Sequence, residues 1–250
     1  MFDYYLGGKD NFAADREAAE QVMRIIPGAA QSARESRRFL RRAVSFLAGE
    51  EGITQFLDIG VGLPTQGAVH EIAQEFSPSV RVVYVDHDPI VVSHAEVLLA
   101  EADVAAVVRG DLRRPKELLS MPGIRDFLDF SQPIAVILQL IVHFIADADD
   151  PAGIIATLRD AVVPGSYLVL SHVSPDALST EAARQAGLRA VSVYQEANEP
   201  MIPRSRAQIE RFFNGWDLVE PGLVPKSEWR PAAGVPGGFD VSLAGVARRP

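Results

Sequence analysis

One short segment combines a carboxylate with closely spaced glycines, a combination suited to ligand binding. Residues 58–67 read DIGVGLPTQG and follow the apolar Phe56 and Leu57, which predicts a turn between a buried strand and a helix. In open α/β sheets, ligands bind at the carboxyl ends of strands, where glycine lets the backbone approach them closely. The dinucleotide fingerprint would need its third glycine at Thr65, whereas that glycine is Gly67, so the usual NAD-binding turn is disfavoured.

Two further acids stand at the ends of later apolar runs. Asp86 ends VVYVD and Asp111 ends VVRGD. An acid after the second strand can accept both hydroxyls of an adenosine ribose, and its charge would reject a 2′-phosphate. An acid after the third strand can accept from the adenine amine. Each acid could instead cap the following helix. Together with Asp58, however, acids at three successive strand ends predict one binding rim.

Short apolar runs alternate with helix-favouring stretches in the middle of the chain. The runs cover 55–60, 80–86, 104–111, 133–140 and 166–172, and the stretches between them include 66–76, 89–102 and 150–163. Nearly continuous apolar strands are typical of parallel sheets buried on both faces, and the alternation predicts a doubly wound α/β fold. Two helices, at about 11–26 and 30–50, are expected before the first strand.

The last part of the chain departs from this alternation. Helix-like runs at 180–195 and 206–213 are followed by strand-like runs at 216–224 and 239–249, whose Pro/Gly-rich connection is too short for a crossover helix. A short connection indicates an antiparallel pair. We therefore expect one domain with a mostly parallel, seven-stranded sheet. Its parts would be an N-terminal helical part (1–52), a ligand-binding core (53–172), a second helical part (173–214) and terminal strands (215–250); the resemblance described below implies that the first includes a lid and the third lies on the substrate side.

Composition excludes several classes of partner. The 250 residues carry 24 basic and 33 acidic side chains, a formal net charge of −9, so nucleic acid and anionic membrane would be repelled. No run approaches the roughly 20 apolar residues of a membrane span, and the N-terminus lacks a signal pattern. Cysteine is absent, which removes disulfides, thiolate nucleophiles and cysteine-based zinc sites. We expect a cytoplasmic protein.

The segments around these acids resemble a known group of enzymes. Asp58–Gly62, Asp86 and Asp111–Leu112 are similar to the first three motifs of class I S-adenosylmethionine-dependent methyltransferases. Longer strings resemble the bacterial S-adenosyl methyltransferase family long catalogued as a domain of unknown function; they are YYLGGKDNFAADREAA, FLDIGVGLPTQGAVHE, VVYVDHDPIV, VHFIADADDPAGI, LRDAVVPGSYLVLSH and GWDLVEPGLV. The resemblance implies a Rossmann-like fold, S-adenosyl-L-methionine as cofactor and methyl transfer. It implies no particular acceptor.

The resemblance also implies which residues hold the cofactor. The glycine turn would take the methionine part, Asp86 the ribose and Asp111 the adenine, and residues 4–11 would form a lid. The string 4–11 could instead be a turn that leads into the first helix. The expected cofactor-binding residues are Tyr5, Gly7, Asp58, Gly60, Gly62, Thr65, Asp86, His87, Asp111, Leu112 and Gln139, the last standing where the fourth motif usually has asparagine or a similar residue.

Two histidines follow later strands and are candidate catalytic residues. His143 comes just after the fourth strand and His172 ends the fifth, and histidine can act as a base near neutral pH. Both could equally be hydrogen-bonded residues that line a pocket. We expect no metal site, because His87, Asp88 and His94 lack the spacing of a helix-face metal pair.

Two other features could concern the substrate. Five arginines lie between 34 and 42, opposite the apolar stripe of a helix, and form either a solvated face or a patch for an anionic substrate; they are Arg34, Arg37, Arg38, Arg41 and Arg42. Segment 180–206 stands where an acceptor wall is expected, with Tyr194, Glu196, Asn198 and Arg204.

The leading hypothesis is methyl transfer from S-adenosylmethionine to a small molecule, without metal, nucleic acid or membrane; the oligomeric state is not specified. Because this chemistry depends on alignment, which can supply roughly 7–11 kcal/mol, a missing base would not exclude it. One alternative is a catalytically silent protein that binds the cofactor as a sensor or interaction module. Another is a nicotinamide oxidoreductase, disfavoured by the glycine spacing and the terminal strands.

Overall fold

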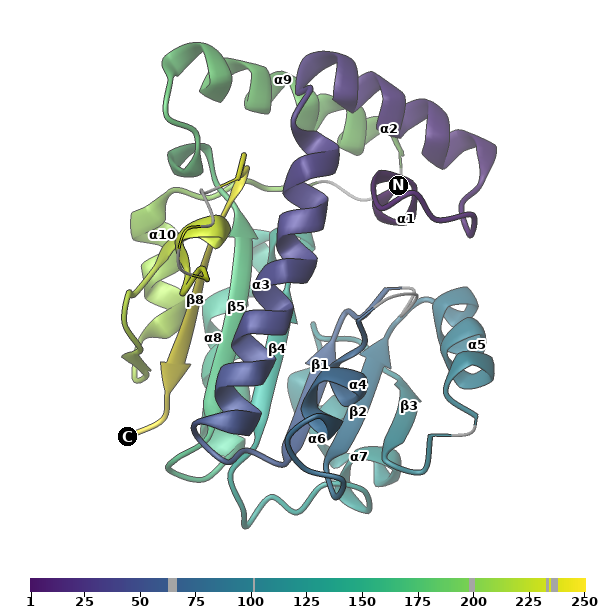
Figure 1. Cartoon of the computed structure of the whole chain (residues 1–250), viewed down its shortest axis with the longest axis vertical. Helices are drawn as coiled ribbons and strands as arrows, with labels where there is room; N and C mark the ends of the chain where they lie inside the picture. Colours follow the sequence, from purple (N-terminus) through teal and green to yellow (C-terminus); the bar gives the residue numbers. More distant parts are fainter. Residues whose placement is uncertain (63–66, 101, 198–200, 233, 235–237) are drawn as a thin grey trace.

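A twisted β-sheet forms the centre of the molecule (Figure 1). The computed structural model describes residues 1–62, 67–100, 102–197, 201–232, 234 and 238–250, without the side chains of 195–197. The strands are β1 (Gln55–Ile59), β2 (Arg81–Asp86), β3 (Ala105–Arg109), β4 (Ala135–Gln139), β5 (Tyr167–Val173), β6 (Asp217–Leu218), β7 (Val224–Pro225) and β8 (Ser242–Arg248).

The strand order is that of a doubly wound sheet closed by antiparallel strands. Neighbours follow the order β3-β2-β1-β4-β5-β8-β6, and the short β7 also pairs with β8. Strands β1 to β5 are mutually parallel, while β8 is antiparallel to β5, β6 and β7. The predicted fold class is therefore confirmed. The two-residue β7 is an additional strand beside the seven of the main path.

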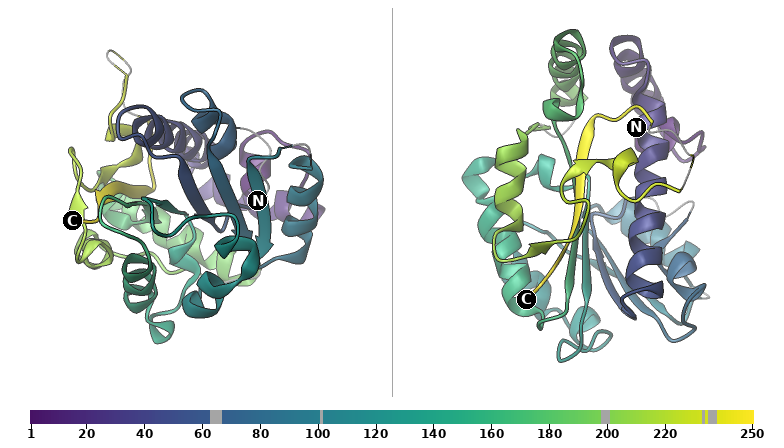
Figure 2. Two further views of the ribbon diagram at one scale, coloured as in Figure 1. Left: turned by 90° about the horizontal axis from the view of Figure 1, so that it is seen from below. Right: turned by 60° about the vertical axis from the view of Figure 1, so that its left-hand side comes forward.

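Helices cover both faces of the sheet (Figure 2). One face carries α3, α4 and α5, and the other carries α6, α7, α8 and α10. The helices are α1 (Phe2–Tyr5), α2 (Ala13–Ile25), α3 (Ala29–Gly49), α4 (Val69–Gln74), α5 (Pro89–Leu98), α6 (Pro115–Ser120), α7 (Pro122–Arg125), α8 (Pro151–Ala161), α9 (Glu181–Ala197) and α10 (Arg206–Glu210). The 3-10 turns are η1 (Val142–Phe144), η2 (Asp147–Asp149), η3 (Pro175–Ala177), η4 (Arg211–Phe213) and η5 (Lys226–Glu228).

The burial of the elements follows from their sequences. All five residues of β1 are buried, as a strand covered on both faces requires. In α3, buried Phe39, Leu40, Ala43 and Leu47 recur at helical spacing and pack against the sheet, while most of the arginines lie on the other side. Within the described residues, no helix is long and apolar enough to cross a membrane.

A separate layer, which we call the cap, lies above the carboxyl ends of the parallel strands. It consists of α1, α2 and α9, and its apolar interior includes Tyr5, Ala19, Val22 and Ala190 (Figure 1). The hydroxyl oxygens of Tyr5 and Tyr194 lie 3.3 Å apart, so the cap joins two segments far apart in the chain. Tyr5 and Gly7, both expected in a lid, belong to the cap region.

The C-terminal part is fastened to α3 by Trp229. Its fully buried ring packs edge-on against Phe39 and Phe46, with ring centroids 5.6 Å and 5.9 Å away. Arg42 donates from Nε to the Trp229 carbonyl (2.8 Å) and from Nη2 to the Lys226 carbonyl (2.6 Å). Arg42 is therefore a structural residue rather than part of a solvated arginine face.

We expect Trp229→Ala to lower the free energy of unfolding by about 3–5 kcal/mol, because it leaves a cavity between α3 and the terminal strands. Trp229→Phe is the matched control. It should cost clearly less, because it keeps an aromatic ring and the indole Nε1 has no hydrogen-bond partner in the described part of the chain. Urea denaturation of both variants measures the effect, and equal losses would contradict the packing argument.

Candidate functional site

The chain makes a tight bend after β1. Gly60 and Gly62 have φ of +78° and +59°, a backbone conformation that favours glycine. The Gly60 amide donates to the Val85 carbonyl (2.8 Å), which fixes the bend against β2. A Cβ on Gly60 would lie 2.5 Å from Cγ1 of Ile141, whereas a Cβ on Gly62 would meet no described atom within 4 Å. Among the described residues, no atom therefore crowds the backbone at Gly62.

The Asp86 carboxylate connects this bend to the turn after β2. Its Oδ2 accepts from the Gly62 amide and its Oδ1 from the Asp88 amide, both at 3.0 Å. His87 follows directly, with its Nδ1 3.5 Å from Oδ1 of Asp86. Asp86 is buried, and each of its oxygens accepts one of these bonds, so further lone pairs are left for a ligand.

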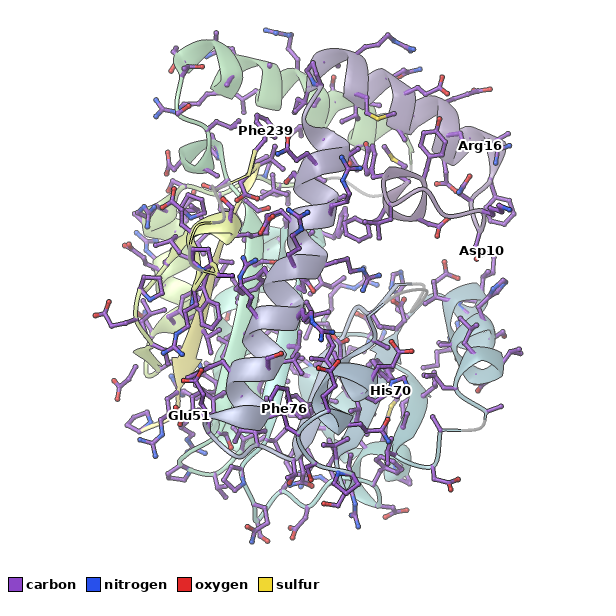
Figure 3. All side chains as sticks on the ribbon, viewed as in Figure 1. Asp10, Arg16, Glu51, His70, Phe76 and Phe239 are labelled. Carbon is purple, nitrogen blue, oxygen red and sulfur yellow. The ribbon has the colours of Figure 1, made fainter. Side chains whose placement is uncertain are left out.

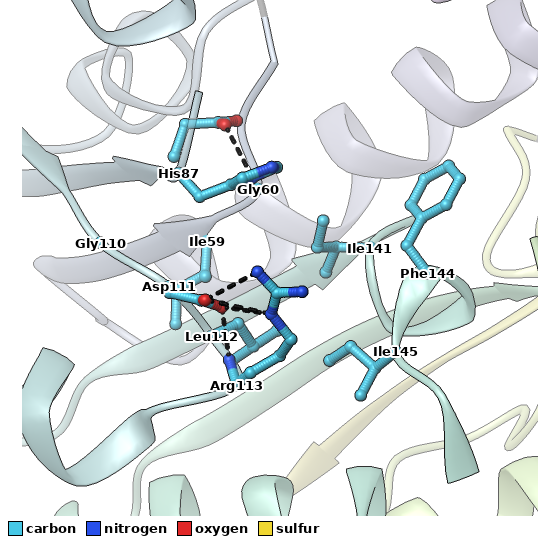
Figure 4. A pocket seen from close by; sticks show the side chains of 11 residues that line it. Ile59, Gly60, His87, Gly110, Asp111, Leu112, Arg113, Ile141, Phe144 and Ile145 are labelled. Carbon is cyan, nitrogen blue, oxygen red and sulfur yellow. Dashed lines mark hydrogen bonds and ion pairs between the residues drawn. The ribbon is translucent and has the colours of Figure 1, made fainter. Parts of the chain in front are cut away.

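Asp111 lies after β3 and is held by Arg113. The guanidinium makes a bidentate contact with the carboxylate, donating from Nε to Oδ1 (2.9 Å) and from Nη2 to Oδ2 (2.8 Å) (Figure 4). The Arg113 backbone amide also donates to Oδ1. Burial on its own would raise the pKa of Asp111, but the Arg113 hydrogen bonds outweigh it and lower the pKa. The carboxylate is thus ionised and oriented.

These groups line one pocket at the carboxyl ends of β1 to β4. Five of the residues expected to bind the cofactor meet there: Gly60, Asp86, His87, Asp111 and Leu112. The remaining lining comes from Ile59, Gly110, Arg113, Ile141, Phe144 and Ile145 (Figure 4). The sequence did not predict the apolar wall formed by η1 and its neighbours. Residues 141–145 read IVHFI, and their apolar side chains give no pattern that would mark a ligand site.

Asp58 is buried in β1 and does not line this pocket. Burial raises its pKa to about 7; the positive charge of Arg37 opposes this, and the negative charge of Asp86 adds to it. No described residue donates a hydrogen bond to its carboxylate. The expected common rim is therefore formed by Asp86 and Asp111, with Asp58 enclosed beside Asp86 and within reach of the charge of Arg37.

The other expected cofactor residues, Gly62 among them, lie outside the pocket lining. The Gln139 amide donates from Nε2 to the Ser36 carbonyl (2.6 Å) and so ties the end of β4 to α3. Tyr5 is buried in the cap, and Gly7, with φ of +80°, follows the C-cap residue Leu6 of α1. Thr65 lies outside the described residues.

The two histidines have different surroundings. His172 is fully buried with both ring nitrogens engaged: Nε2 accepts from Nη1 of Arg204 (3.0 Å), so Nδ1 donates to the Val173 carbonyl (2.8 Å). Burial lowers the pKa of His172 to about 4. His143 is also buried, and burial holds its pKa well below the usual value. Its Nδ1, however, has no hydrogen-bond partner in the described part of the chain.

Arg204, which donates to the buried ring of His172, is itself buried and hydrogen-bonded to several other groups. Its guanidinium also donates to the carbonyls of Val142 and Ile145 and to Asp147 (2.6 Å from Nη2), and it is 3% exposed. It therefore supports η1 and η2 from within instead of forming an exposed part of an acceptor wall. No group of three or more metal-ligating side chains occurs among the residues that the structure describes.

Comparisons with known proteins agree with this architecture. A family model described as S-adenosyl methyltransferase matches residues 1–250. A solved DUF574 family protein from Streptomyces avermitilis MA-4680 is 41% identical, with a TM-score of 0.93 over 100% of this chain and 95% of that one. A candidate methyltransferase from Thermobifida fusca YX is 40% identical, with a TM-score of 0.90 over 99% and 92%.

A more distant structure shares the fold alone. The N-methyltransferase NodS from Bradyrhizobium japonicum WM9 is 14% identical, with a TM-score of 0.54 over 89% of this chain and 99% of that one. None of the curated proteins matches. The chain belongs to the S-adenosyl methyltransferase family. It is an S-adenosylmethionine-dependent methyltransferase with a Rossmann-like fold, as the sequence motifs predict.

We expect the buried Asp58 to make folding stability depend on pH. Its pKa is about 7 when folded and 3.8 as an ordinary value, so the folded state binds the proton more tightly. The free energy of unfolding should therefore fall as pH rises from about 4 to 7, by up to about 1.4 kcal/mol per pH unit from this group, and then level off.

Asp58→Asn cannot ionise and should remove this contribution, while Asp103→Asn, at an exposed acid, should leave it in place. Urea denaturation of the three proteins between pH 4 and pH 8 is the measurement. Curves of equal slope for wild type and Asp58→Asn would show that Asp58 does not hold a proton in the folded state.

Proposed function

We propose that this enzyme methylates a small-molecule acceptor that enters between the cap and the pocket at the carboxyl ends of β1 to β4. The observation that carries the proposal is that Gly60 of the glycine bend, Asp86 and Asp111 line one and the same pocket. The cap lies over the same sheet edge, with α9 as its substrate-side part. The net charge of −9 disfavours nucleic acid as the acceptor.

The residues present suit the cofactor. Asp86 would accept from the ribose hydroxyls and Asp111 from the adenine amine, and Leu112 and Ile141 offer apolar surface to the base. A Cβ placed on Gly62 would meet no described atom within 4 Å, which supports a position for the methionine part beside this bend. When bound, S-adenosylmethionine supplies a methyl group on an electron-poor sulfonium. The task of the chain is to orient the two reactants and exclude water.

Of the two histidines, His143 is the better candidate for a residue that moves a proton. It lies in η1, and the two residues that follow it, Phe144 and Ile145, line the pocket. Its lowered pKa keeps the ring neutral, the form that can accept a proton. His172 would first have to give up its hydrogen bond with Arg204. Its surroundings favour the alternative that it is a structural residue.

We expect Gly62→Val to abolish binding of S-adenosylhomocysteine, because the side chain would occupy the open space at the bend. Gly222→Val is the matched control: Gly222 also has positive φ (+89°) and free space around its Cβ, but it lies near the C-terminal strands. Isothermal titration should show wild-type affinity for Gly222→Val. Binding that survives in Gly62→Val would exclude this bend from the cofactor site.

The class of acceptor can be tested directly. The enzyme is incubated with methyl-labelled S-adenosylmethionine and a bacterial extract divided by ultrafiltration into small molecules and macromolecules. We expect label to be transferred only in the small-molecule fraction and only with active enzyme, with Gly62→Val as the inactive control. Transfer to protein or nucleic acid in the macromolecular fraction would refute a small-molecule acceptor.

A further inference from the structure

The apolar wall of the pocket belongs to a segment without long helices or strands. The wall consists of Ile141, Phe144 and Ile145, which lie between β4 and α8. Within residues 140–150, all of which the structure describes, the regular elements are the short turns η1 and η2. The segment begins at Leu140 with a φ of +54°, a left-handed conformation that is uncommon outside glycine. Buried carbonyls in such a segment need hydrogen-bond donors from elsewhere in the chain.

Arg204 supplies these donors. Its Nη1 donates to the Val142 carbonyl (3.1 Å), and its Nη2 donates to the Ile145 carbonyl (2.8 Å). Nη1 also donates to Nε2 of His172 (3.0 Å), while Nη2 and Nε donate to Oδ1 of Asp147 (2.6 Å and 3.2 Å). A guanidinium has five N–H donors, and these contacts use all of them. Arg204 therefore joins η1, η2 and the end of β5 through one side chain.

The backbone around Arg204 is bound to the same region. The Arg204 amide donates to the Val173 carbonyl at the end of β5 (3.2 Å), and the Ile202 amide donates to the His143 carbonyl in η1 (2.8 Å). Residues 201–204 come after α9 in the chain, but they are not part of the apolar interior of the cap. The wall is therefore held from a position beside the sheet rather than by the helices of the cap.

Stability alone does not require a charged residue at this position. The Arg204 side chain is 3% exposed, whereas that of its acidic partner Asp147 is 73% exposed. Burial of a guanidinium costs desolvation energy that an ion pair often does not repay, and an apolar residue of similar volume is often as stabilising. An apolar side chain, however, could not donate to the carbonyls of η1. The specific contribution of the guanidinium is therefore the position of these carbonyls, and with it the position of the wall.

We propose that Arg204 is a positioning residue of the cofactor site, which holds the apolar wall at the spacing from Asp86 and Asp111 that the adenosyl group requires. This inference rests on the proposed function, because it takes their pocket as the cofactor site. In the described part of the chain, Arg204 does not line that pocket, so it acts through η1 and not by contact with the cofactor. His143 lies in the same turn, so a shift of η1 would displace it together with the wall.

The test compares two arginines that both donate to backbone carbonyls. Arg204→Lys keeps the charge but loses the planar fork that reaches several acceptors at once. We expect it to weaken the binding of S-adenosylhomocysteine by about 10-fold or more, because the carbonyls that hold the wall lose their donors. Arg42→Lys is the matched control, because Arg42 donates to the carbonyls of Lys226 and Trp229, outside the pocket lining. It should lower stability in urea denaturation but leave the affinity in isothermal titration unchanged.

Equal losses of affinity in the two variants, or no loss in Arg204→Lys, would overturn the proposal. If Arg204→Lys does not fold, as judged by circular dichroism, Asp147→Ala replaces it, because this change at an exposed residue removes the acceptor of two Arg204 donors. Asp149→Ala, at another exposed acid of η2, is then the control. A loss of affinity confined to Asp147→Ala would support the positioning role, and equal effects of both changes would reject it.

The tautomer of His172 gives a readout that a general loss of stability would not produce. Because Arg204 can only donate, His172 must carry its proton on Nδ1, which donates to the Val173 carbonyl. Nitrogen-15 NMR of the wild type at pH 7 should show this neutral tautomer, with the signal assigned through His172→Gln. A proton on Nε2 would overturn the proposal. Wild type that shows the expected tautomer but binds no S-adenosylhomocysteine would refute the proposed function, and the inference with it.

Discussion

The ligand-binding edge of this enzyme depends on the hydrogen bonds that the Asp86 carboxylate accepts from two separate turns. One oxygen takes the Gly62 amide and the other the Asp88 amide, so a single buried side chain fixes the bend after β1 and the turn after β2. Charge-assisted bonds of this kind are stronger than neutral ones. They hold the glycine backbone close to the carboxylate expected to receive the ribose, before any ligand arrives.

The pKa values of the acids around this edge are shifted in opposite directions at the surface and in the interior. The hydrogen bonds from Arg113 lower the pKa of Asp111, whereas burial raises the pKa of Asp58 to about 7. Burial of a charge is tolerated only where an opposite charge or donors compensate it. At Asp58 the compensation within the described residues comes from the nearby charge of Arg37 alone. A buried carboxylate thus lies beside the pocket without lining it.

Much of the fold could be predicted because it follows from local patterns. Continuous apolar runs predicted the parallel strands, and the short connection near the C-terminus predicted the antiparallel pair. That Asp86 and Asp111 line the same pocket could be predicted because parallel strands end at one edge of a sheet.

The remaining features depend on contacts between distant segments. Gln139 bonds to Ser36, His172 to Arg204, and Arg42 to the carbonyls of Lys226 and Trp229. These pairs are separated by 32 to 187 positions along the chain, and no spacing rule relates such residues. For the same reason, the sequence could not show that Arg42 holds the C-terminal part while Arg38 and Arg41 pair with acids at the surface.

The cap has an apolar interior of its own, separate from the two layers that sandwich the sheet. Regions with independent cores can open locally at a fraction of the cost of global unfolding. Loosening of α1, α2 and α9 would leave the strands and their turns intact, so admission of an acceptor and retention of the cofactor can be governed by different parts of the molecule. Substitutions inside the cap would then alter the path by which an acceptor enters, while the pocket at the carboxyl ends of β1 to β4 keeps its geometry.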